Sequence, residues 1–147
     1  MFMKTKTILN SQVIVLLALL LIMAASCKKD RLDGAYNRLV GEWEWLWTAG
    51  GVTSSFDTPD SAGFTITLIF EERGIYKIDK NNERLERGRL NIVNSEPYSL
   101  IDFVIELKPQ SEYFFMSQQQ VYFWSDDSLV LRDDLCADCF SRGFVRK

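Results

Sequence analysis

Apolar and polar side chains alternate with a period of two along most of the chain beyond residue 40. In the first run of this kind, Trp43, Trp45 and Trp47 share one face. Period-two runs that are rich in aromatic and β-branched residues are typical of half-buried β-strands. A helical candidate is confined to a single turn within residues 31–39. The pattern predicts eight strands, at residues 41–48, 63–70, 74–80, 85–93, 98–107, 113–124, 128–133 and 140–146.

Short turn sequences separate these predicted strands. Residues 71–74 end in a glycine, which adopts positive φ angles without strain, and Asn81-Asn82 supplies residues that tolerate left-handed conformations. Eight short antiparallel strands joined by tight turns predict an all-β fold, a small up-and-down β-barrel, because closure leaves no unpaired strand edge. A sandwich of two sheets is the alternative architecture for the same pattern.

The N-terminal region follows a different pattern. A short basic end that contains Lys4 and Lys6 precedes an apolar run at residues 13–25, and the small residues Ala24-Ala25-Ser26 lie directly before Cys27. The order of basic end, apolar run and small residues is typical of a secretory signal peptide. An uncleaved membrane anchor is the alternative, but a spanning helix needs about 17–25 apolar residues, which is more than this run provides.

A cysteine directly after such a segment resembles the lipobox of bacterial lipoproteins. The resemblance implies that the Cys27 thiol carries acyl chains such as palmitate, which attach the protein to a membrane. It divides the chain into a lipoprotein signal peptide at 1–26, a lipidated tether at 27–39 and a barrel domain at 40–147. Because Lys28 rather than an aspartate follows Cys27, the resemblance implies a location in the cell envelope, at the outer membrane of a Gram-negative bacterium.

The start and the end of the predicted barrel carry a second resemblance. Gly41-Glu42-Trp43 is similar to the Gly-x-Trp signature of lipocalins, and the chain resembles the short lipocalin-like lipoproteins of Gram-negative bacteria. The resemblance implies a structural role for Gly41, a Trp43 side chain that plugs the closed end of the barrel, and an Arg146 guanidinium that stacks on this indole. Such a stack contributes about 1–2 kcal/mol where it is shielded from water.

The other aromatic residues near the first strand are candidate ligand-binding residues. If Trp43 closes one end, Trp45 and Trp47 stand successively higher along the interior. An eight-stranded barrel is wide enough either to be filled by side chains or to hold one small ligand, so both a packed core and a ligand cavity stay open. The connection at 49–62 is longer than the usual connection of about 2–5 residues. We expect either a lid, with Phe56 reaching into the barrel mouth, or a surface loop.

Two further cysteines, Cys136 and Cys139, lie near the C-terminus. With Cys27 acylated, they form an even pair in an oxidising compartment, so we expect a local disulfide that pins the last hairpin. A redox site is one alternative, but it would need the pair at the N-terminus of a helix. A metal site is the other, but it would combine carboxylates with thiolates, which prefer different ions. We therefore predict a disulfide and no metal site.

The composition restricts the function further. The chain contains no histidine, which removes the commonest general base and the commonest metal ligand. A formal net charge of −3 gives no electrostatic footprint for nucleic acid. The sequence also lacks a phosphate loop, a nucleophile elbow and a paired-acid motif. We therefore predict a protein that is not an enzyme and that uses no cofactor.

The predicted function is that of a lipid-anchored envelope protein whose lipocalin-like barrel binds a small apolar ligand near Trp45 and Trp47. The alternative is a protein-binding module of the envelope, such as an inhibitor or an assembly factor, with a barrel filled by side chains. A cavity large enough for a ligand would favour the first function. A filled barrel with an exposed apolar patch at Phe56 or at Tyr113-Phe114-Phe115 would favour the second.

Overall fold

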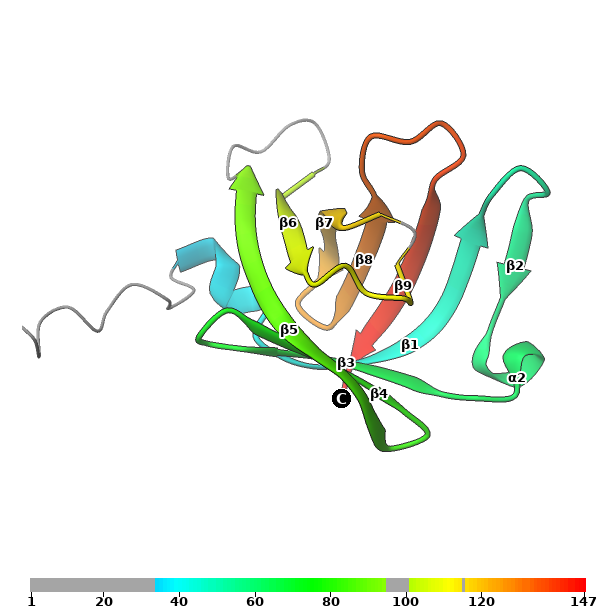
Figure 1. Cartoon of the computed structure of the whole chain (residues 1–147), viewed down its shortest axis with the longest axis horizontal. Coiled ribbons are helices and arrows are strands. Elements are labelled where there is room, and N and C mark those ends of the chain that lie inside the picture. The colour runs from blue at the N-terminus through cyan, green and yellow to red at the C-terminus, as the bar shows by residue number, and fades with distance from the viewer. Residues whose placement is uncertain (1–33, 95–100, 115) are drawn as a thin grey trace, which may run out of the picture. The chain divides into compact units, whose positions relative to one another are not determined.

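A computed structural model shows how the predicted barrel is built (Figure 1). The structure describes residues 34–94, 101–114 and 116–147. The predicted signal peptide, the lipidation site Cys27 and the beginning of the tether lie outside the described residues.

The described residues form nine strands and two short helices. In chain order these elements are η2 (Gly34–Arg38), β1 (Gly41–Gly50), β2 (Ser55–Asp57), α2 (Pro59–Ala62), β3 (Ile66–Glu71), β4 (Ile75–Lys80), β5 (Glu83–Asn94), β6 (Phe103–Lys108), β7 (Gln118–Ser125), β8 (Ser128–Asp133) and β9 (Phe140–Arg146). Within this part of the chain, no helix has the length and hydropathy that crossing a membrane would require.

Eight of these strands close into an antiparallel barrel. In the order β1-β3-β4-β5-β6-β7-β8-β9 each strand pairs with the next, and β9 pairs back onto β1. β2 is added to β1 outside this circuit. The strands curve around a common interior (Figure 1). The predicted all-β up-and-down barrel of eight strands is therefore confirmed, and closure through β1 and β9 excludes the two-sheet sandwich.

The predicted strands correspond to β1 and to β3 through β9, and the largest differences in their bounds lie in β6 and β7. The sequence predicted strands at 98–107 and 113–124, whereas β6 spans Phe103–Lys108 and β7 spans Gln118–Ser125. The loop between them carries Phe114, which is buried against the core. Tyr113 and Phe114 thus pack onto the barrel from a loop, at residues where the alternation in the sequence predicted a strand.

The core fills the closed end of the barrel and extends beyond the strands. Leu39 is fully buried, and the ring of Tyr36 packs edge-on against Phe103 with centroids 4.6 Å apart. η2 and Leu39 therefore pack on the barrel, although the sequence placed them in the tether. The buried hydrophobic side chains of the core are Leu39, Trp43, Trp45, Ile66, Leu68, Phe70, Tyr76, Ile78, Leu90, Phe103, Ile105, Leu107, Phe114, Val121, Leu129, Leu131 and Phe144.

Candidate ligand-binding pocket

One end of the barrel is closed by Trp43. Its side chain is fully buried, and its Nε1–H donates to the carbonyl oxygen of Leu39 at 2.7 Å. The guanidinium carbon of Arg146 lies 4.2 Å from the centroid of the Trp43 ring, which is the stack expected from the sequence. The same guanidinium donates to the carbonyl oxygens of Val40 at 2.9 Å and Arg38 at 2.7 Å. Arg146 therefore ties the chain before β1 to the last strand.

Gly41 is required by the same contact. Its φ is +141°, and a Cβ at this position would lie 2.5 Å from Nη1 of Arg146. Any side chain there would strain the backbone and displace the guanidinium. The structure thus gives Gly41 a structural role at the closed end.

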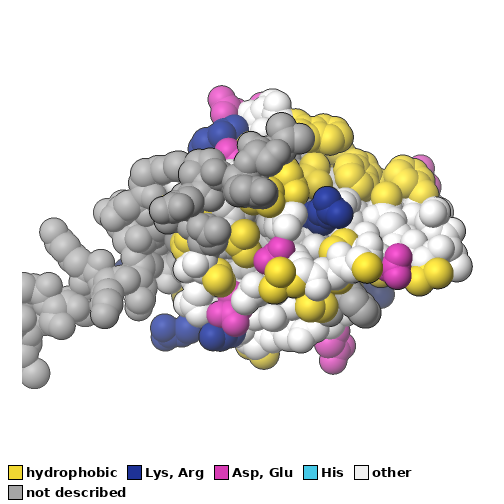
Figure 2. Space-filling view, turned by 90° about the horizontal axis from the view of Figure 1, so that it is seen from above, with side chains coloured by type: hydrophobic (Ala, Val, Ile, Leu, Met, Phe, Trp, Pro, Cys, Tyr) yellow, Lys and Arg dark blue, Asp and Glu magenta, His cyan; other side chains and the backbone are white. Residues whose placement is uncertain are grey.

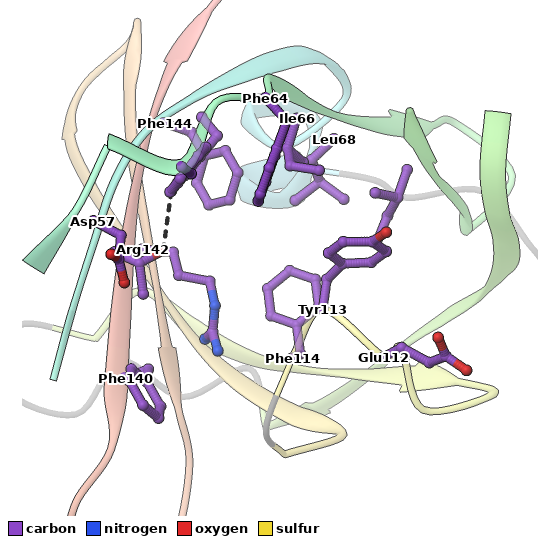
Figure 3. Close-up of a pocket in the computed structure, with 14 residues that line it drawn as sticks. Asp57, Phe64, Ile66, Leu68, Glu112, Tyr113, Phe114, Phe140, Arg142 and Phe144 are labelled. Carbon is purple, nitrogen blue, oxygen red and sulfur yellow. Dashed lines mark hydrogen bonds between the residues drawn. The ribbon is translucent and has the colours of Figure 1, made fainter. Parts of the chain in front are cut away.

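The other end of the barrel holds a pocket of about 540 Å³ (Figure 3). Its walls are mainly aromatic and aliphatic, and they come from the barrel strands, from β2 and α2, and from the loop between β6 and β7. The lining residues are Trp45, Thr48, Asp57, Ala62, Phe64, Ile66, Leu68, Ile78, Glu112, Tyr113, Phe114, Phe140, Arg142 and Phe144. The barrel is therefore packed at one end and hollow at the other.

The hollow end arises because β3 separates from β1 after a short pairing. The two strands pair only over residues 41–44 of β1. Over residues 48–50, β1 pairs instead with β2. The segment formed by β2 and α2 then brings Asp57 and Ala62 to the pocket.

The connection at 49–62 is thus a structured part of the pocket wall, where the sequence predicted either a lid or a surface loop. Its short helix α2 is capped by Thr58, whose Oγ1 accepts from the backbone N–H of Ser61 at 3.3 Å. Gly63 ends the helix in a left-handed conformation, with φ +73°. The signal for this helix is present in the sequence as Thr58-Pro59-Asp60-Ser61, because a capping side chain followed by proline marks a helix start.

Trp45 is the predicted ligand-binding residue that lines the pocket. Its Nε1–H donates to Oγ1 of Thr48 at 3.0 Å. Its ring stacks on Phe64, with centroids 5.7 Å apart and an interplanar angle of 19°. These contacts fix the indole as a flat apolar surface at the pocket.

Trp47 and Phe56 are not among the residues that line this pocket, so their contact with a ligand stays a prediction. A β-bulge interrupts the pairing of β1 with β9 between Trp45 and Trp47. The extra residue of a bulge shifts the alternation of the residues that follow it. Trp47 then pairs with Gly143 and stacks on Phe56, whose side chain is 64% exposed.

A charged side chain enters the pocket from β9. Arg142 is only 8% exposed and extends between the rings of Phe140 and Phe114 (Figure 3). Its guanidinium carbon lies 4.9 Å from the Phe114 centroid and 5.7 Å from the Phe140 centroid. Burial lowers the pKa of Arg142, an effect that the neighbouring Asp133 carboxylate opposes. Because arginine stays protonated in proteins, the pocket contains a positive group within an apolar wall.

Asp133 balances this charge. It is fully buried, and its Oδ1 accepts from Nη1 of Arg142 at 3.0 Å and from Nε2 of Gln119 at 2.7 Å. Its Oδ2 accepts from the backbone N–H of Phe140 at 3.2 Å. Nε2 of Gln119 donates in addition to the carbonyl oxygen of Met116 at 2.6 Å. The Asp133 carboxylate therefore has three donors, of which the Arg142 guanidinium supplies one.

A second polar cluster holds the loop that contributes Tyr113 to the pocket. The buried Tyr76 hydroxyl contacts the Glu86 carboxylate and lies 2.8 Å from the carbonyl oxygen of Pro109. Ser111 Oγ donates to Glu86 at 2.9 Å and accepts from the backbone N–H of Tyr113 at 3.1 Å. Burial, together with the bond to Glu86, raises the pKa of Tyr76, so its hydroxyl remains a donor.

Cys136 and Cys139 are joined by a disulfide in the loop between β8 and β9. This loop leads directly into Phe140, which lines the pocket. The local bridge expected from the sequence therefore lies next to the pocket wall. Elsewhere among the described residues, no group of three or more His, Cys, Asp or Glu side chains is placed to hold a metal ion.

Sequence reasoning missed Arg142, Asp133 and Gln119, although a signal for Arg142 exists. Arg142 lies two positions before Phe144 and four positions before Arg146. The same alternation that turns Arg146 toward Trp43 therefore turns Arg142 inward as well. The position of this arginine in the last strand therefore indicates a positive charge inside the barrel.

Comparison with known proteins gives no assignment, since the chain matches no protein-family model, no curated protein and no solved structure. The evidence on which a function can be proposed is therefore the closed barrel and the composition of its pocket.

Proposed function

We propose that this protein is a lipid-anchored, lipocalin-like envelope protein whose barrel binds a small apolar molecule and catalyses no reaction. The observation that carries the proposal is the pocket of about 540 Å³ at one end of a barrel whose other end is packed. Small-molecule sites are typically concave, mostly apolar and about 300–1,000 Å³ in volume. The pocket has this size and this type of lining.

The polar side chains of the pocket support binding rather than catalysis. Those that titrate are Asp57, Glu112, Tyr113 and Arg142. The two carboxylates are exposed, whereas Arg142 is buried and does not release its proton near neutral pH. Since the chain has no histidine, this set of residues is suited to holding a ligand and poorly suited to transferring protons.

Binding is tested by filling the pocket. Ala62→Trp places a large side chain at the lining, and Ala137→Trp makes the same change at an exposed position of the loop between β8 and β9. The neutral dye Nile red should bind the wild-type protein and Ala137→Trp in lipid nanodiscs, above the signal of protein-free nanodiscs. It should bind Ala62→Trp at least about tenfold more weakly, a loss of about 1.4 kcal/mol. Equal binding by all three proteins would contradict the proposed pocket.

The membrane attachment is supported by the lipobox-like sequence before Cys27. Mass spectrometry of the processed protein should find acyl chains on an N-terminal Cys27, and Cys27→Ser should prevent both processing and acylation. An N-terminal peptide that retains residues 1–26 in the wild-type protein would contradict this part of the proposal.

The second candidate function is the binding of another protein, and the exposed side chain of Phe56 favours it. Val52 and Phe56 are 84% and 64% exposed. Figure 2 shows hydrophobic side chains toward the end of the molecule at which β1 and β2 lie in Figure 1. A photo-crosslinker at position 56 should then give a defined protein adduct in cells, while one at the exposed position 85 should not. Absence of an adduct specific to position 56 would contradict a partner at this surface.

A further inference from the structure

Arg142 is an unusual lining residue for a pocket that binds only apolar molecules. A buried charge costs free energy unless it is paired and hydrogen-bonded. Arg142 has five N–H donors in a planar fork, and within the described residues Asp133 is the acceptor that it bonds, through Nη1. The charge is therefore balanced, but most of the hydrogen-bonding capacity of this guanidinium is not used by the described residues.

The remaining donors of Arg142 face the pocket. Within the described residues, one fully enclosed side-chain nitrogen or oxygen atom lacks a hydrogen-bond partner, and it is Gln119 Oε1. Nε and Nη2 of Arg142 are not in this class of enclosed atoms without a partner. They are therefore accessible from the pocket, although the side chain as a whole is only 10% exposed. Figure 3 shows this guanidinium at the pocket, with the rings of Phe114 and Phe140 on either side. These rings hold the fork in place before any ligand arrives.

We infer that the pocket recognises an apolar monocarboxylate, whose carboxylate is bound by Arg142 and whose hydrocarbon part lies along Trp45 and Phe64. This inference rests on the proposed function and names the class of ligand. A carboxylate matches the guanidinium fork with two parallel hydrogen bonds, which are stronger than bonds between neutral groups. Ordering costs are small because the guanidinium is already held between two rings.

The other charges near the pocket are compatible with an anionic ligand. Asp133 keeps the donors from Gln119 and from the backbone of Phe140 when Arg142 turns its remaining donors to a ligand. Asp57 and Glu112 are exposed, so solvent and salt screen them. The carboxylate of Glu112 points away from Arg142 (Figure 3).

The test compares two ligands that differ only in their polar end, octanoate and 1-octanol. Binding is followed by tryptophan fluorescence of the wild-type protein in nanodiscs, with protein-free nanodiscs as the blank. A bond between charged partners is worth about 1.5–3 kcal/mol, so octanoate should bind roughly tenfold to a hundredfold more tightly than 1-octanol. This wild-type comparison needs no variant.

Two variants locate the preference. Arg142→Met combined with Asp133→Asn removes both charges of the buried pair, and the ratio of the two affinities should fall to about one. Arg132→Met removes a positive charge from an exposed position of β8 and should leave the ratio unchanged. Loss of the preference in the double variant alone supports the inference.

Three outcomes would overturn it, and they separate it from the proposed function. Equal affinity of the wild-type protein for octanoate and 1-octanol, with Nile red still bound, would refute the role of Arg142 and leave the apolar pocket intact. A preference for octanoate that survives in the double variant would place the carboxylate elsewhere. Failure of Nile red, octanoate and 1-octanol to bind would refute the inference together with the proposed function.

Discussion

The ion pair between Arg142 and Asp133 allows the sharpest test of how the pocket end is built. Arg142→Met leaves the fully buried Asp133 carboxylate without its cation. Removing one partner of a buried pair costs about 3–5 kcal/mol. Because a domain is stable by only about 5–15 kcal/mol in total, this single substitution should remove a large part of the stability.

Adding Asp133→Asn to Arg142→Met should restore most of the loss. The amide of the new asparagine is neutral and still accepts from Gln119, which donates to Oδ1 at 2.7 Å in the wild-type protein. One lost neutral hydrogen bond accounts for about 0.5–1.5 kcal/mol. We therefore expect the double variant to lie within about 2 kcal/mol of the wild type.

Urea denaturation followed by tryptophan fluorescence measures these differences, provided that the slope against urea stays constant. Arg132→Met is the matched control, since Arg132 is exposed on β8 and its loss should change stability by less than about 0.5 kcal/mol. If Arg142→Met were as stable as Arg132→Met, Asp133 would not be the buried and paired carboxylate described above. If the single and double variants were equally unstable, the shape of methionine rather than the charge would be the cause.

Three further predictions concern the walls of the barrel. Tyr76→Phe should lower the free energy of unfolding by about 1–3 kcal/mol, as measured by urea denaturation. Because the pKa of Tyr76 is raised in the native state, the stability that its hydroxyl contributes is complete below about pH 10 and is lost as the pH rises further. The variant should therefore lose less stability at alkaline pH than the wild type does. A Cβ at Gly143 would overlap the Trp47 indole, so Gly143→Ala should cost about 1–3 kcal/mol; in a Trp47→Ala background the cost should vanish, and an unchanged cost in thermal denaturation would refute the contact. Replacing Cys136 and Cys139 by serine should lower the free energy of unfolding by about 2 kcal/mol, the chain-entropy value for a short loop; a wild-type protein with two free thiols in thiol titration would contradict the bridge.

Much of the fold was predictable because the barrel strands follow the period of two closely. In β4 the buried Tyr76 and Ile78 alternate with less buried side chains, and the strand appears in the structure at nearly the residues predicted from the sequence. The closed end was predictable for a different reason. Gly41, Trp43 and Arg146 form a local signature, and the close approach of Arg146 to Gly41 explains why these residue types stand there.

The pocket was only partly predictable, because its shape depends on departures from regular alternation. The bulge in β1 adds one residue between Trp45 and Trp47, and no glycine or proline marks it in the sequence. The separation of β3 from β1 depends on whether β1 pairs with β2 or with β3 at each position. No short sequence pattern specifies such pairing between distant strands. The inward position of Arg142 on β9 could be predicted from the alternation. Its pairing with Asp133 could not, because it depends on the register of β8 against β9.

The most direct measurement of the central claim is an NMR titration of the tryptophan indole N–H groups with 1-octanol. The chain has 4 tryptophans, so each signal can be assigned with single Trp→Phe variants. The indole of Trp45 lines the pocket, whereas Trp47 stacks on Phe56 and Trp124 is 76% exposed. We predict that the Trp45 signal shifts with saturation while the Trp47 and Trp124 signals stay in place. Saturable shifts at Trp47 or Trp124 without one at Trp45, or no shift at any of them, would show that the hollow end of the barrel does not bind apolar molecules.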